Sequence, residues 1–150
     1  MFIVSLYITN MKQFFILMFL FSVGNLICQN AVHSDSVIYN YEDKVNYWRG
    51  EPYTGISTKH YSNGQLQNEI NYKEGKNHGT GICWHSNGQV WSEKNYKKGL
   101  LHGMSRHWYE NGIQQDEEKY ENGNRIYKRC WEKDGSEIDA SDPNFKWLFE

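Results

Sequence analysis

The chain has 150 residues, with 16 lysines and arginines against 18 aspartates and glutamates, so one domain of mild negative charge is expected. Lys12 is the single charged residue among the first 28, which leaves residues 29–150 with a net charge of −3. Nucleic-acid binding needs a clustered basic face that displaces counterions from phosphates. The composition therefore argues against a nucleic-acid partner.

Residues 1–28 are typical of a signal peptide. A short positive start at Met11–Lys12 precedes an apolar run over residues 14–21, and we expect cleavage after Cys28, which leaves Gln29 first. Met11 is an alternative start, because residues 1–10 carry no charge. The pattern predicts export to the periplasm, the outer surface or the medium.

Two alternatives to a cleaved signal peptide stay open, and both would attach the protein to a membrane. A lipoprotein would be acylated on Cys28, although Ile27 is larger than the residue that usually precedes such a cysteine. An uncleaved membrane anchor needs about 20 apolar residues, and the run over residues 14–27 is shorter unless residues 1–10 join it.

A 24-residue unit recurs through the rest of the chain. Asn-Gly pairs begin at residues 63, 87 and 111, and several other columns keep the same spacing. These columns are the glycines Gly55, Gly79 and Gly103, the glutamates Glu69, Glu93 and Glu117, the tyrosines Tyr72, Tyr96 and Tyr120, and the closing glycines Gly75, Gly99 and Gly123. We predict a repeat domain over residues 47–135, with about three full units and partial ends, after a lead-in over residues 29–46.

The turn chemistry predicts what each unit forms. Asn-Gly between alternating segments favours a two-residue hairpin turn of type I′. Counting outward from the turn in the second unit pairs His85 with Val90, Trp84 with Trp91, Ile82 with Glu93 and Gly79 with Tyr96. The third unit sets Arg106 opposite Glu117, and each repeat tyrosine faces a glycine that leaves room for its ring. The expected fold is all-β: an elongated antiparallel meander of hairpins.

The two ends of the array should be capped. Residues 45–50 resemble the second half of a unit, and residues 31–44 are expected to be a leading strand or an irregular lead-in. At the other end, Asp142-Pro143 is a favourable helix start, so residues 136–150 are predicted to form a C-terminal cap with a short helix from about Pro143.

The columns resemble the MORN-repeat variant family, whose units carry a glycine, an aromatic pair, Asn-Gly, a glutamate, an aromatic residue and a closing glycine. The unit that begins at Gly79 fits this order, and the resemblance spans roughly residues 47–135. Bacterial members are often labelled YwqK-type antitoxins, which implies neutralisation of a partner toxin. Two departures are the export signal and Tyr127, which stands where the fourth unit should have glycine.

The repeated polar residues and the cysteines fit structural roles better than chemical ones. A catalytic carboxylate occurs once or as a pair, whereas the glutamate column recurs in every unit, which favours a structural role. His78 and His102 would lie two strands apart, about 10 Å, too far to share a metal ion. Cys83 and Cys130 would lie about 19 Å apart, beyond disulfide range, so free thiols are expected. We expect no catalytic, cofactor or metal site, and therefore no enzyme.

Trp84, Trp91 and Trp108 are predicted to share one sheet face, either packed against neighbouring units or open to a ligand. The leading hypothesis is an exported, non-catalytic module that binds a protein partner through its sheet. The alternatives are antitoxin-like neutralisation of a toxin, and binding of a glycan or envelope surface through the aromatic stripe. The partner's identity and the oligomeric state stay open.

Overall fold

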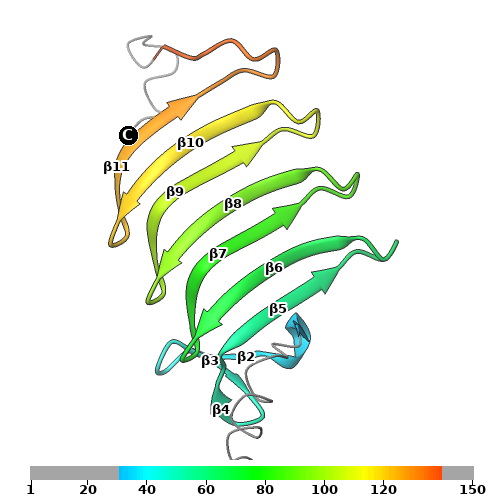
Figure 1. Cartoon of the computed structure of the whole chain (residues 1–150), viewed down its shortest axis with the longest axis vertical. Coiled ribbons are helices and arrows are strands. Elements are labelled where there is room, and N and C mark those ends of the chain that lie inside the picture. The colour runs from blue at the N-terminus through cyan, green and yellow to red at the C-terminus, as the bar shows by residue number, and fades with distance from the viewer. Residues whose placement is uncertain (1–30, 140–150) are drawn as a thin grey trace, which may run out of the picture. The chain divides into compact units, whose positions relative to one another are not determined.

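The computed structural model describes residues 31–139, which are almost entirely β-structure (Figure 1). Seven strands follow one another in order across one antiparallel sheet. They are β5 (Gly55–His60), β6 (Leu66–Lys73), β7 (Lys76–Trp84), β8 (Val90–Lys97), β9 (Leu100–Trp108), β10 (Gln114–Glu121) and β11 (Asn124–Cys130). The predicted all-β hairpin meander is confirmed. No helix within residues 31–139 is long and apolar enough to cross a membrane.

The lead-in contains ordered strands, and a leading strand was one of its two expected forms. The short strand β1 (Val32–His33) joins the large sheet parallel to β5, which makes it eight-stranded, and a 3₁₀ turn (Ser34–Ser36) follows. The strands β2 (Ile38–Asn40), β3 (Val45–Trp48) and β4 (Glu51–Pro52) then form a separate three-stranded sheet. The predicted signal peptide and the C-terminal helix from Pro143 lie outside the described residues.

The Asn-Gly turns differ from the predicted type I′ geometry. In the first unit the amide N of Gly64 donates to the carbonyl of Tyr61 at 2.9 Å, and the amide N of Tyr61 donates to Gln65 at 2.8 Å. Gly64 has a φ of +85°, whereas Asn63 is not among the residues with positive φ. This is a three-residue loop that ends in a left-handed glycine, the next commonest hairpin connection.

The longer loop corrects the predicted register beside the turn. Trp84 pairs with Val90 instead of Trp91, and Val90 therefore does not face His85. A bulge absorbs the extra residue, so the pairs farther from the turn are as predicted. The confirmed pairs are Ile82 with Glu93, Gly79 with Tyr96, Gly55 with Tyr72, Gly103 with Tyr120, and Arg106 with Glu117.

Gly79, which pairs with Tyr96, does not make room for the tyrosine ring as predicted. A side chain at Gly79 would meet the Cβ of Asn71 at 3.8 Å, whereas the ring of Tyr96 lies 3.4 Å from the Cβ position of Gly81. Gly79 has a φ of +81° at a bulge in β7, so its backbone, not ring packing, requires glycine. The side-chain amide of Asn71 donates to the carbonyl of Thr80 at 2.7 Å and holds this bulge.

The tight two-residue turns with two positive φ angles join the strands at the ends opposite the Asn-Gly turns. They are Glu74-Gly75, Lys98-Gly99 and Asn122-Gly123, and Arg49-Gly50 makes the same turn in the small sheet. Gly75 also joins the two sheets, because its amide N donates to Tyr53 at 2.7 Å and its carbonyl accepts the amide N of Asn46 at 2.8 Å. Backbone hydrogen bonds therefore dock the small sheet against the β6–β7 turn.

The asparagines of the Asn-Gly turns link successive units. The Oδ1 of Asn87 accepts the backbone N–H of Gln89 at 3.0 Å, and its amide nitrogen donates to the carbonyl of Glu110 in the next turn at 3.0 Å. Asn63 and Asn111 make the same two contacts, and Asp134 replaces asparagine at the last described turn. Asparagine is favoured at this position because its side chain can both accept a hydrogen bond within its own turn and donate one to the next turn.

We expect Asn87→Asp to destabilise the fold by about 1–2 kcal/mol, because aspartate keeps the acceptor, loses the donor and places a negative charge beside the Glu110 carbonyl. Asp134→Asn is the matched control and should change stability by less than about 0.5 kcal/mol. Urea unfolding of both variants at neutral pH measures the difference. Equal losses in the two variants would contradict a linking role for the amide.

Candidate interaction surfaces

The repeated glutamate column has a structural environment. The guanidinium of Arg106 lies between Glu117, at 3.2 Å, and Glu93, at 3.8 Å, on the two neighbouring strands. Glu69 occupies the same row of the sheet, opposite Thr58 and Ile82. The row thus forms cross-strand ion pairs in the later units, which gives these glutamates a structural role.

The three tryptophans do not share one face, which corrects the predicted stripe. The ring of Trp91 lies 6.4 Å from the ring of His107. His107 immediately precedes Trp108 in β9, and successive side chains of a strand point to opposite faces. Trp91 therefore lies on the face opposite Trp108, because it stands at the bulge of β8 and not at a regular strand position.

Trp91 is also unlike its counterparts in the repeat. The corresponding bulge residues are Gln67 and Gln115, so the unit does not need an aromatic ring here. Trp84 and Trp108, which recur in one column, are half-buried, whereas Trp91 is 47% exposed. Trp91 is thus an exposed aromatic residue at a position where the other units have glutamine.

Side chains hold the ring of Trp91 from both sides. The ring of His85 lies 6.3 Å away and that of His107 6.4 Å away, and the Nδ1 of His107 contacts the Oδ1 of Asp116 at 2.7 Å. A hollow of about 160 Å³ adjoins Trp91 and is lined in part by Lys59, Tyr61 and Cys83. We call Trp91, its two histidines and this hollow the Trp91 patch.

The last unit contains an unrepeated charged cluster. Glu118 is 8% exposed and accepts from the Tyr120 hydroxyl at 2.7 Å and from Arg125 at 3.1 Å, and the ammonium of Lys128 lies 3.4 Å away. Burial and the contact with Glu118 raise the pKa of Tyr120 to about 12, so Tyr120 remains a donor. Since Glu118 is buried and surrounded by these partners, the cluster stabilises the fold and is not an open site.

Ser92, His107 and Asp116 lie opposite one another on three neighbouring strands, an order that resembles a hydrolytic triad. Ser92 is 3% exposed, however, and a nucleophile must reach its substrate. Among residues 31–139 there is no cluster of three or more metal-binding side chains. Cys83 and Cys130 are free thiols, as expected from their spacing, and burial raises the pKa of Cys130.

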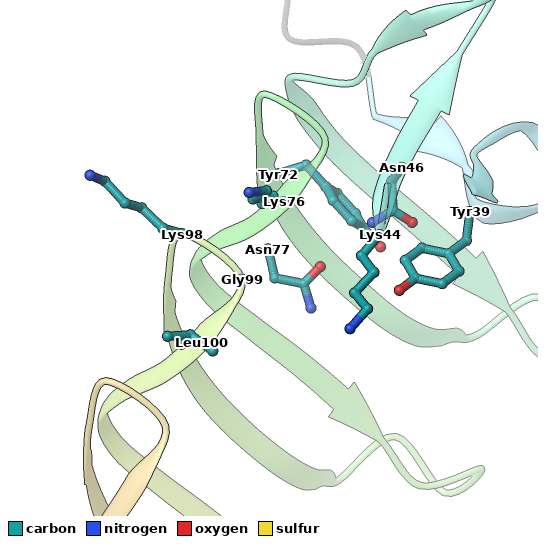
Figure 2. Close-up of a pocket in the computed structure, with 9 residues that line it drawn as sticks. All are labelled: Tyr39, Lys44, Asn46, Tyr72, Lys76, Asn77, Lys98, Gly99 and Leu100. Atoms are coloured by element: carbon teal, nitrogen blue, oxygen red, sulfur yellow. The ribbon is translucent and has the colours of Figure 1, made fainter. Parts of the chain in front are cut away.

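A basic pocket that the sequence analysis missed lies beside the tight turns. Figure 2 shows Tyr39 of β2 and Lys44 of the β2–β3 turn facing Asn77 of β7. Lys76 of β7 and Lys98 of the β8–β9 turn also line the pocket, with Lys98 farthest from Lys44. The pocket measures about 530 Å³, and we call it the edge pocket. The sequence does contain a signal for this pocket, because Lys76 departs from the repeat: the corresponding positions of the next two units are Leu100 and Asn124.

Comparison with known proteins supports the repeat type. The sequence model of the family described as MORN repeat variant matches residues 53–74 and 77–98, which are two adjacent repeats. No curated protein and no solved structure matches the chain. Residues 53–98 therefore carry MORN-type repeats, which are generally non-catalytic and associated with protein or membrane interactions.

Proposed function

We propose that this chain is an exported, non-catalytic module that binds a partner protein through the Trp91 patch. The observation that carries the proposal is that Trp91 is exposed and replaces the glutamine found at the same bulge in the neighbouring units. A residue that the fold does not require, in an orientation held by neighbours, is a candidate for recognition.

The chemistry of the patch suits a protein partner. Tryptophan is enriched among the residues that dominate binding energy at protein interfaces, where it fills a desolvated pocket. The hollow beside Trp91 can accept a side chain from the partner, while His85 and His107 fix the ring in place. The ring loses little conformational freedom on binding, which favours affinity.

The exported location rests on the signal-peptide pattern of residues 1–28. An exported chain would meet its partner in the envelope or the medium. Antitoxin-like neutralisation, implied by the family resemblance, requires a toxin in the same compartment and is a special case of the same protein-binding activity.

A second candidate is glycan binding at the same patch. An exposed tryptophan can stack against a sugar ring, and the His107–Asp116 pair adds polar groups beside it. This alternative predicts that soluble cell-wall fragments change the fluorescence of the wild-type chain but not that of Trp91→Phe.

Crosslinking in the protein's own cells tests the protein partner. We expect a photoreactive residue at Lys59, which lines the hollow beside Trp91, to give one adduct of discrete mass in the envelope or medium fraction. Trp91→Ala in the same chain should remove most of that adduct, because the patch loses its anchor.

The control places the photoreactive residue at Lys119, which is exposed on the face opposite Asp116 and His107. It should give no such adduct. Adducts of equal yield from both positions, or adducts that persist in Trp91→Ala, would contradict binding through this patch. Adducts confined to the cytoplasm would contradict export.

A further inference from the structure

We infer that the edge pocket binds a small ligand that carries a phosphate group. This site is separate from the Trp91 patch and independent of the proposed protein partner. It lies where the small sheet docks against the tight turns of the large sheet, whereas Trp91 stands beside the Asn-Gly turns at the other edge (Figure 1).

The pocket concentrates positive charge in a chain that is acidic overall. Lys44, Lys76 and Lys98 line it, and an adjoining hollow that shares two of these lysines adds Lys73. Glu74 also lines the adjoining hollow, but no described carboxylate lies within 4.0 Å of any of these four lysine ammonium groups. An anion in the pocket would therefore supply a counter-charge that the described carboxylates do not provide at close range.

The repeat does not require Lys76 or Lys98. Position 76 of the first unit corresponds to Leu100 and Asn124, and position 98 corresponds to Glu74 and Asn122. Lys44 and Lys98 also have left-handed backbones, with φ of 58° and 53°, where asparagine is better tolerated. The left-handed position also accepts Arg49 and Glu74 in the equivalent turns, so the backbone does not select lysine there. Lysine at positions 76 and 98 is thus not required by the repeat and is available for a role in binding.

The remaining groups complete a site for phosphate oxygens. In Figure 2 the Lys44 ammonium, the Asn77 side-chain amide and the Tyr39 hydroxyl are directed toward the same space, and Lys98 extends away from them at the rim. Among residues 31–139, no side-chain hydrogen bond occupies the Asn77 amide or the Tyr39 hydroxyl. Lysine binds phosphate as a point charge, and neutral donors can satisfy the other oxygens.

The size and walls of the pocket indicate a small molecule. A volume of about 530 Å³ is within the usual range of small-ligand sites, about 300–1,000 Å³. Leu100 and Tyr72 add apolar surface beside the lysines, which would contact the non-phosphate part of the ligand. The phosphate could belong to a soluble compound or to a lipid headgroup, and these two sources can be separated by experiment.

The test measures binding of sodium pyrophosphate to the full chain by calorimetry in a metal-free buffer. We expect saturable binding that Lys44→Gln with Lys76→Gln weakens at least about tenfold and Asn77→Ala weakens several-fold. The charge-matched control, Lys119→Gln with Lys133→Gln, should stay within about twofold of wild type. Thermal unfolding of each variant verifies that these surface changes leave the fold intact.

A second arm uses vesicles of one part phosphatidylglycerol to three parts phosphatidylcholine, with pure phosphatidylcholine vesicles as the control for apolar insertion. Loss of anionic-vesicle binding in the Lys44/Lys76 variant assigns a lipid headgroup, and pyrophosphate binding without vesicle binding assigns a soluble ligand. Absence of both, or equal weakening by the site and control variants, overturns the proposal.

Discussion

Gly75→Ala is expected to destabilise the protein by about 3 kcal/mol or more and to loosen the small sheet from the large one. An added Cβ would clash with the Cγ1 of Val45 and lie 2.7 Å from the carbonyl oxygen of Asn46. A left-handed alanine, here at a φ of +72°, costs about 1–2 kcal/mol, and overpacking adds about 1–3 kcal/mol. Urea unfolding measures the total loss.

Gly64→Ala is the matched control for the backbone cost. Gly64 has a φ of +85° and no atom within 4 Å of its Cβ position, so only about 1–2 kcal/mol should be lost. Hydrogen exchange should show early opening at the amide N of Asn46 in Gly75→Ala and not in Gly64→Ala. Equal stability losses, with no local opening, would show that the Gly75 contact does not hold the two sheets together.

Glu118→Ala is expected to cost about 3 kcal/mol, because it leaves Arg125 and Lys128 partly buried beside a lost counter-charge. Burial acts to raise the pKa of Glu118, but hydrogen bonds from Tyr120 and Arg125 and the charge of Lys128 outweigh it and lower the pKa. The ionised carboxylate is therefore bound more favourably in the folded state than in the unfolded one.

The sign of the pH dependence follows from that lowered pKa. Glu118 contributes its stability above its ordinary pKa of 4.5, and the contribution is lost as the pH falls through the lower folded value. The stability difference between wild type and Glu118→Gln should therefore be largest near neutral pH and shrink below about pH 4.5. A difference that does not change between pH 7 and pH 3 would assign the effect to packing instead of charge.

Much of the fold follows from regular spacing in the sequence. The glycine, glutamate and tyrosine columns predict the hairpin order, and they place pairs such as Gly79 with Tyr96 and Arg106 with Glu117 correctly. The turn assignment was wrong because Asn-Gly fits two loop lengths. The longer loop is stabilised by the side chain of Asn87 reaching Glu110 in the next unit, a contact that local turn preference does not include.

The two candidate surfaces were harder to predict for a related reason. A bulge of one residue moves Trp91 to the face opposite Trp108, which pairing by simple counting cannot foresee. The edge pocket forms from Lys44 and Lys76, which belong to different sheets, so its location depends on how Gly75 docks them. Positions that depart from the repeat pattern, such as tryptophan in place of glutamine at residue 91, are the sequence feature that points to these surfaces.

The native mass of the protein recovered under mild conditions from its own cells tests the central claim most directly. We predict a species heavier than the mature chain, residues 29–150, by the mass of another protein. Trp91→Ala should remove this species, whereas Trp108→Ala, if folded, should retain it. Recovery of the uncombined chain alone, or a complex that persists unchanged in Trp91→Ala, would contradict a protein-binding module that acts through this patch.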